Sequence, residues 1–200
     1  NGIDPWEIIN EYGADAFRWA LLSDSAPWNS KRFSRQIVAE AKSKVIDTIT
    51  NTHAFYALYA KIDGYHPEEH PRQVAVHVLD RWILSRLHST LQQVVKGLEI
   101  YDFLNPAKQI EAFVDELSNW YVRRSRDRFW GSGLNADKVS AYQTLRDVLL
   151  TLAQMMAPYA PLIADDLYAN LGGVGSVHLT DYPAANESLR DAALENDMDA

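Results

Sequence analysis

The segment from Asn119 to Trp130 concentrates side chains that bind single-stranded nucleic acid. On a helix that turns about 100° per residue, one side carries an amide, two guanidinium groups and an indole, spaced four, three and four residues apart: Asn119, Arg123, Arg126 and Trp130. Guanidinium groups bind phosphates and base edges, and an aromatic face stacks on an unstacked base. The row therefore predicts an RNA-binding surface. The alternative is an ordinary solvated helix face, which has the same residue types.

The opposite side of the same predicted helix carries an apolar stripe, which indicates packing in a core. The stripe consists of Ile110, Phe113, Val114, Leu117 and Tyr121. Two further arginines, Arg124 and Arg128, project toward this side. A guanidinium group near a core is stabilised by a carboxylate partner or by a helix C-terminus. We therefore expect structural roles for Arg124 and Arg128, such as a buried or peripheral ion pair.

Lys44 and Asn51 are weaker candidates for RNA contact. They lie seven residues apart on a helix that is predicted from Ser34 to about Ala60, so they share one of its faces. A cation and an amide on one face suit RNA, but simple solvation of an exposed face is the competing interpretation.

The usual catalytic and metal-binding patterns are absent or interrupted. The glycine-rich stretch 172–175 follows a predicted helix and not a strand, so it indicates a helix end and not a phosphate loop. In the stretch 66–70, His-Pro-Glu-Glu-His, Pro67 stands where the helical zinc-protease motif needs Glu, and Pro71 follows. A loop is predicted there. We therefore expect no catalytic residue, cofactor or metal site in this chain.

Charge is distributed unevenly along the chain, whose formal net charge is -8. Residues 159–200 hold eight acidic residues against one basic residue, Arg190, and contribute -7. Residues 117–130 carry +3. A general nucleic-acid binder is usually basic as a whole, so a basic island in an acidic protein indicates one defined partner.

Composition bounds the class of protein. A hydrophobic fraction of 47% and a charged fraction of 23% are typical of a globular chain. No cysteine is present, which excludes disulfides and thiolate metal sites and favours a reducing, cytoplasmic location. No apolar run is long enough for a membrane span. The first residues resemble no signal peptide and lack Met, so we expect an excised piece of a longer chain.

Helical periodicity extends over almost the whole sequence. Asp4 and Ser34 are predicted N-caps, with Glu7 at a capping-box spacing, and Asn105 is predicted to cap the helix that contains the arginines. A short extended piece is expected at 177–179. Helices are predicted at 5–12, 14–22, 34–60, 76–98, 105–129, 137–156, 161–171 and from Asn186 onward. Four helices of about twenty residues with short connections favour an antiparallel bundle.

Several strings resemble one enzyme family. The opening NGIDPWEIINEYGADAFRW resembles the segment that follows the KMSKS loop in class I aminoacyl-tRNA synthetases for isoleucine, valine and leucine. The string DRWILSRL at 80–87 and the segment 117–130 are similar to helices of that family's anticodon-binding domain, and 117–130 resembles the isoleucyl enzymes most. The stretch 155–168 is similar to the helix pair that follows. The resemblance covers roughly residues 1–183.

The resemblance implies an all-α antiparallel bundle of the class I synthetase anticodon-binding type with a short helical N-terminal appendage. It divides the chain into a segment 1–33 that continues from the catalytic domain, a bundle 34–171, and a linker with a C-terminal helix, 172–200. The implied partners are the tRNA that accepts isoleucine and the parent's own catalytic domain. The implied parent is a cytoplasmic monomer.

The implied parent enzyme attaches isoleucine to tRNA with ATP, and its ATP and zinc are held by parts outside this chain, which alone is expected to be inactive. Two alternatives stay open. One is the same region of a valyl or leucyl enzyme, and the other is a helical protein-interaction module.

Overall fold

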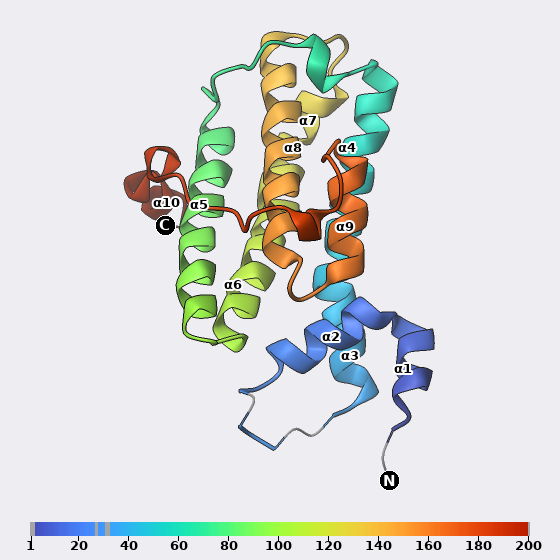
Figure 1. The fold of residues 1–200 in the computed structure, drawn as a ribbon. Helices are drawn as coiled ribbons and strands as arrows, with labels where there is room; N and C mark the ends of the chain where they lie inside the picture. Colours follow the sequence, from blue (N-terminus) through green and yellow to red (C-terminus); the bar gives the residue numbers. More distant parts are fainter. Residues whose placement is uncertain (1–2, 27, 31–32, 200) are drawn as a thin grey trace.

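Helices make up the regular structure in the computed structural model, which describes residues 3–26, 28–30 and 33–199 and has no strand among them (Figure 1). Two π-helical segments, Lys42–Asp47 and Glu116–Val122, join α3 to α4 and α6 to α7, and 3-10 turns occur at Pro67–Glu69, Val177–Leu179 and Glu187–Leu189. The α-helices are α1 (Pro5–Tyr12), α2 (Ala14–Ser23), α3 (Arg35–Ala41), α4 (Thr48–Asp63), α5 (Val78–Glu99), α6 (Leu104–Asp115), α7 (Arg123–Trp130), α8 (Ala136–Met156), α9 (Pro161–Asn170) and α10 (Ala192–Asp199).

Four helical rods form the bundle that the sequence predicts, and rods that follow each other in the sequence run antiparallel. The rods α3–α4 and α6–α7 run upward in Figure 1, and α5 and α8 run downward. Going around the bundle, α4 contacts α8, α8 contacts α5, α5 contacts α6, and the π-helical segment before α7 contacts α4. The rods α4 and α6–α7 are therefore parallel neighbours, and so are α5 and α8.

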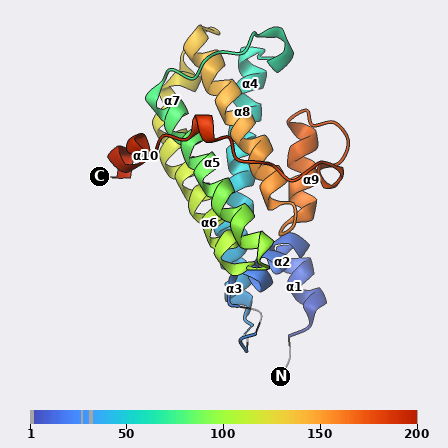
Figure 2. The same ribbon diagram turned by 60° about the vertical axis from the view of Figure 1, so that its left-hand side comes forward.

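The remaining helices lie against the ends and one side of this bundle. Helices α1 and α2 pack against α3 at its lower end, and Asp15 of α2 accepts hydrogen bonds from the backbone N–H groups of Leu162 and Ile163 at the start of α9. The C-terminal segment crosses the bundle, and α10 packs against α5 (Figures 1 and 2). The boundaries at residues 33 and 171 stay a prediction. No described helix is both long and apolar enough to cross a membrane.

Local side chains cap two helix starts as predicted. The Asp4 carboxylate accepts from the Trp6 N–H at 2.9 Å, and the Ser34 hydroxyl accepts from the Ile37 N–H at 3.4 Å. Glu7 lies at the capping-box position, but its carboxylate binds the Arg35 guanidinium at 2.5 Å. A cation on the neighbouring helix is a stronger partner for a carboxylate than a neutral backbone N–H.

Asn105 does not cap the helix that leads to the arginines, so this prediction is wrong. The Asp102 carboxylate accepts from the N–H groups of Leu104 and Asn105 at 3.1 and 3.2 Å, and α6 begins at Leu104. A carboxylate three residues earlier therefore takes the capping role, because it satisfies two of the free N–H groups at the helix start.

Two predictions for the C-terminal segment are also wrong. The stretch Val177–Leu179 is a 3-10 turn and not an extended piece, because Asp165 accepts from the Val177 N–H at 2.8 Å and folds the chain back. Asn186 caps only the turn Glu187–Leu189. The last helix begins later, at Ala192, where the Asp191 carboxylate accepts from the Leu194 N–H.

Candidate nucleic-acid interface

The π-helical segment Glu116–Val122 decides which side chains α7 presents to the core. The predicted stripe through Tyr121 is buried as expected, but the next buried positions are Val122, Ser125 and Phe129. A π-helical turn contains an additional residue, so the core face after it shifts by one position. Ser125 and Phe129 therefore occupy the places that a continuous α-helix would assign to Arg124 and Arg128.

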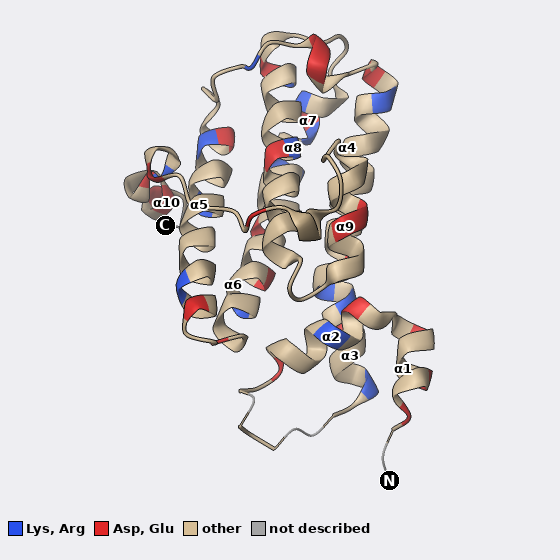
Figure 3. Ribbon diagram, in the orientation of Figure 1, with Lys and Arg blue, Asp and Glu red and all other residues tan. Residues whose placement is uncertain are grey.

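The predicted RNA-contacting row lies at the surface. Trp130 is 55% exposed, and Arg123 and Arg126 are exposed without a hydrogen bond or ion pair to any described residue. Asn119 is exposed and donates its amide to the Asp115 carboxylate at 2.6 Å. Figure 3 shows basic positions on α7, toward the upper end of the bundle. The role of these four residues in RNA binding stays a prediction.

Packing shows which flank of α7 carries the row. Phe129 points inward, where its ring meets Phe55 of α4 at 5.2 Å and Tyr142 of α8 at 5.0 Å between centroids. Measured around the helix axis from Phe129, Arg126, Trp130 and Arg123 lie about 60° to 120° away in one direction. Arg128 lies about 100° away in the other direction, and it binds α5. The row therefore lies on the α4 side of α7.

The neighbouring helix α4 contributes to the same surface. Phe55, which touches Phe129, marks the side of α4 that faces α7. Asn51, Leu58 and Ile62 lie within about 60° of Phe55 around α4, and all three are exposed. We call the surface formed by these three and by Arg123, Arg126 and Trp130 the α4–α7 surface. Sequence analysis did not single out Leu58 and Ile62; the i, i+4 spacing of these two apolar residues beside Phe55 was the available signal.

Lys44 lies apart from this surface. It is exposed in the π-helical segment Lys42–Asp47, where it pairs with Glu40 at 3.4 Å and lines a small cavity together with Trp19 of α2 and Lys108 of α6. At about 1.5 Å per residue, it is roughly 16 Å along the rod from Phe55, the neighbour of Phe129. The fold therefore brings Asn51, but not Lys44, to the level of the arginine row.

The expectation for Arg124 is wrong. Its side chain is exposed, and its guanidinium carbon lies 3.9 Å from the centroid of the Trp120 ring. It makes a cation–π contact and no ion pair with a described carboxylate. The π-helical turn has rotated Arg124 away from the core side.

Arg128 makes a largely buried ion pair. Its side chain is 10% exposed, and its two terminal nitrogens donate to the two oxygens of the fully buried Asp80 at 2.7 and 2.8 Å. It also donates to Asp137 at the start of α8. Tyr121 and Ser140 donate their hydroxyls to Asp80 at 2.8 and 3.1 Å. The network joins α5, α7 and α8.

Burial and neighbouring charges shift the pKa of two members of this network. Burial raises the pKa of Tyr121 well above its usual value, and the Asp80 charge raises it further. Burial alone would lower the pKa of Arg128, but hydrogen bonds to Asp80 and Asp137 outweigh it and raise that pKa. Tyr121 is therefore a neutral donor and Arg128 a permanent cation. Asp80 lies in the string DRWILSRL at 80–87, which the sequence analysis had singled out; this string was the available signal for the network around Asp80.

A second buried ion pair supports the turn after α7. Lys138 is 2% exposed, pairs with Asp63 at the end of α4 at 2.5 Å, and donates to the Gly131 carbonyl at 2.6 Å. The Tyr142 hydroxyl donates to the same carboxylate at 2.5 Å.

Among the residues that the structure describes, no group of three or more His, Cys, Asp or Glu side chains could hold a metal ion.

The ion pair between Arg128 and Asp80 thus anchors α7 to α5, while one flank of α7 exposes cations and an indole. This combination defines a class: helical domains that present a basic and aromatic surface to a partner. The chain belongs to the family of anticodon-binding domains of tRNA ligases, because the model described as "Anticodon-binding domain of tRNA ligase" matches residues 80–200.

Two curated relatives of the chain are named isoleucine–tRNA ligases. The chain is 55% identical over its 200 residues to isoleucine–tRNA ligase 2 of Bacillus cereus and spans 19% of that protein. It is 43% identical over 204 residues to isoleucine–tRNA ligase of Clostridium acetobutylicum, with 99% of the chain and 20% of the relative covered. The chain thus spans about a fifth of these relatives, and the family resemblance that the sequence indicated is confirmed.

A solved structure shows the same fold. The ternary complex of LeuRS, tRNA and LeuAMS from Agrobacterium radiobacter K84 matches with a TM-score of 0.69, over 94% of this chain and 22% of that chain. The identity is 18%, so this likeness concerns the fold alone. It agrees with the all-α bundle described above.

Proposed function

We propose that this chain is the tRNA-binding region of an isoleucine–tRNA ligase and that the α4–α7 surface contacts the anticodon stem and loop. The observation that carries the proposal is the exposed row of Arg123, Arg126 and Trp130, whose arginines have no partner within the described chain. Relatives with 55% identity that are named isoleucine–tRNA ligases favour isoleucine over valine or leucine.

The chemistry of the surface suits an unstacked loop. Arg123 and Arg126 offer guanidinium donors to phosphates or base edges, and Trp130 offers a stacking face. Leu58 and Ile62 form an apolar border beside it. The amide of Asn51 can pair with a base edge, because an amide both donates and accepts. The Asn119 side-chain nitrogen donates to Asp115, and its side-chain oxygen is available to accept a hydrogen bond from RNA.

The proposal extends to the whole protein. It attaches isoleucine to its tRNA with ATP, and it holds ATP and zinc outside these 200 residues. It works in the cytoplasm as a monomer. The absence of cysteine supports a reducing compartment. In this arrangement α1 and α2 brace the catalytic part, and the 200-residue chain alone catalyses no ATP–pyrophosphate exchange.

The test is fluorescence anisotropy with a labelled anticodon stem-loop of isoleucine tRNA and a valine stem-loop as the matched RNA. We expect weak binding of the isoleucine RNA that declines steeply with salt, because few cations meet phosphate while the chain is net negative. The double variant Arg123→Ala/Arg126→Ala should lose most of the binding. Lys96→Ala, which removes an exposed cation from α5, should lose little.

Two results would contradict the proposal. Affinity that is the same at low and high salt would exclude an electrostatic RNA contact and favour a protein-interaction module. Equal losses for Lys96→Ala and for the double variant would show that binding is not localised on the α4–α7 surface.

A further inference from the structure

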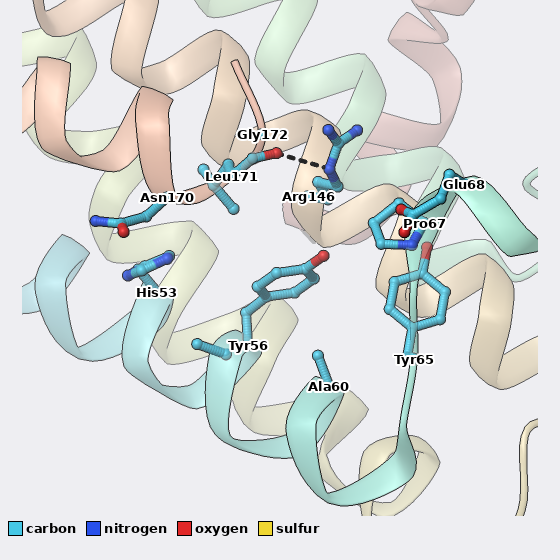
Figure 4. A pocket seen from close by; sticks show the side chains of 11 residues that line it. His53, Tyr56, Ala60, Tyr65, Pro67, Glu68, Arg146, Asn170, Leu171 and Gly172 are labelled. Carbon is cyan, nitrogen blue, oxygen red and sulfur yellow. Dashed lines mark hydrogen bonds between the residues drawn. The ribbon is translucent and has the colours of Figure 1, made fainter. Parts of the chain in front are cut away.

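A cavity of about 610 Å³ opens on the other flank of α4, where α4 meets α8, the end of α9 and the turn at 64–68 (Figure 4). His53, Tyr56 and Ala60 of α4 line it, and they face away from the side that carries Asn51. Its volume lies within the range of small-molecule sites. An α-helix is about 10 Å across, so only the width of α4 separates the cavity from the α4–α7 surface.

Arg146 of α8 enters this cavity without an anionic partner. Its Nε donates to the Leu171 carbonyl at 2.9 Å, which fixes the guanidinium plane. The adjacent carboxylate, Asp147, is engaged by Arg72. No described carboxylate pairs with Arg146, and its terminal nitrogens have no hydrogen bond to a described residue. A half-buried guanidinium whose two terminal nitrogens are free is suited to bind a planar acceptor.

Two tyrosines beside Arg146 also have unpaired hydroxyls. Tyr56 and Tyr65 are 7% and 4% exposed, and neither hydroxyl has a hydrogen-bond partner among the described residues. Figure 4 shows both hydroxyls on the Arg146 and Pro67 side of their rings. Burial is the main cause that raises the pKa of both phenols, so both are neutral donors.

The other buried tyrosines make this pair unusual. Tyr121 and Tyr142 donate to carboxylates, and Tyr159 donates to the Phe103 carbonyl. Buried polar groups are almost always paired. Among the buried tyrosines that are described, only Tyr56 and Tyr65 have unpaired hydroxyls, and both lie beside an unpaired guanidinium, which indicates groups that can take a polar partner from outside the chain. Tyr65 and Arg146 also line a smaller neighbouring cavity of about 180 Å³.

We propose that this cavity binds one unstacked nucleotide of the RNA strand that the α4–α7 surface engages, an inference that rests on the proposed function. Arg146 and the Tyr56 hydroxyl donate to acceptors on the base, and Asn170 can both donate and accept. Ala57, Ala60 and Pro67 provide an apolar wall for the base. The Glu68 carboxylate at the rim favours the donors of a base and disfavours a bare phosphate.

The direct test is a two-dimensional NMR titration of the isotope-labelled 200-residue chain with AMP, GMP, CMP and UMP, and separately with inorganic phosphate. We expect at least one mononucleotide to shift the amide signals of Tyr56, Arg146 and Gly172 at millimolar concentration. Inorganic phosphate alone should leave them in place. Absence of shifts with all four nucleotides, or equal shifts with phosphate, would overturn the proposal.

Variants show whether the shifts come from binding in the cavity. Tyr56→Phe removes a hydroxyl with no partner in the chain, so stability should be retained. Its nucleotide affinity should fall by about tenfold, as expected for a lost hydrogen bond to a polar ligand. Arg146→Lys should weaken binding at least as much, because it loses the planar fork. Tyr159→Phe, whose hydroxyl lies outside the cavity, is the control and should keep full affinity. Unchanged affinity in both cavity variants would refute the site.

Failure of this inference can be told apart from failure of the proposed function. Mononucleotide shifts need no α4–α7 surface, so they should persist in Arg123→Ala/Arg126→Ala. If stem-loop RNA binds through the arginine row but Tyr56→Phe and Arg146→Lys bind it normally, only the cavity proposal is wrong. If mononucleotides bind and stem-loop RNA does not, the proposed function is wrong.

Discussion

The two sides of α7 hold their arginines in opposite ways. Arg128, on the α5 side, is 10% exposed and bonded to two carboxylates. Arg126, only two residues earlier and on the α4 side, is exposed and bonded to no described residue. The residue type is the same, so the environment alone separates a structural cation from a candidate recognition cation. The buried pair fixes the helix, and the free side chains can then meet a partner without moving the backbone.

This arrangement has an energetic reason. A buried ion pair costs much desolvation energy and is kept only when its hydrogen bonds are complete, as they are around Asp80. An exposed arginine loses little hydration energy when the chain folds, and it remains available to an external phosphate. We therefore expect substitutions on the two sides of α7 to affect different properties, stability on one side and RNA affinity on the other.

The largest effect should come from the α5 side. Arg128→Ala leaves the Asp80 charge buried without its partner, so we expect a loss of about 3–5 kcal/mol in the free energy of unfolding. Urea unfolding monitored by circular dichroism measures it. Arg126→Ala is the matched control and should change stability by less than about 0.5 kcal/mol. Similar losses for both variants would remove the distinction between the two sides.

Trp130→Ala should reveal the strongest contact of the α4 side. If a base stacks on the indole, the variant loses about 1–3 kcal/mol of binding free energy for the anticodon stem-loop. Stability should stay unchanged, because the side chain is 55% exposed. Trp28→Ala removes an indole that is 83% exposed and lies outside the surface, and it should bind normally. A normal affinity for Trp130→Ala would exclude stacking there.

Arg123→Ala and Arg126→Ala should produce smaller, salt-dependent losses. Each variant that removes a phosphate contact should lower the slope of log affinity against log salt by about one unit. Anisotropy titrations at several salt concentrations measure this slope, and both variants should unfold at the same urea concentration as the parent chain. A slope that does not change would mean that these guanidinium groups do not meet phosphate.

Arg124→Ala should have the smallest effect, and it tests the shift caused by the π-helical turn. The lost cation–π contact with Trp120 should cost about 0.5–1 kcal/mol of stability, far less than Arg128→Ala. RNA affinity should change little, because Arg124 lies on the flank away from α4. A stability loss as large as that of Arg128→Ala would mean that Arg124 has a buried partner after all.

Local sequence signals were sufficient for the helices and for the exposure of the row. Apolar residues at helical spacing predicted the stripe from Ile110 to Tyr121, and Asp4 and Ser34 cap the helices that they were expected to cap. These features depend on neighbours within one or two turns, so they can be derived from residue order. The exposure of Arg123, Arg126 and Trp130 followed from the same periodicity.

The partners of the arginines could not be derived in this way. A π-helical turn has no reliable local signature, and its one-residue shift moved Arg124 onto Trp120 and brought Phe129 into the core. Asp80 is 48 residues from Arg128, and Asn51 lies still further from Arg123 along the chain. Such neighbours meet only when the four rods pack. The joining of α4 to the arginine row, and the unpaired hydroxyls around Arg146, are therefore products of tertiary packing, because burial and pairing depend on contacts between distant segments.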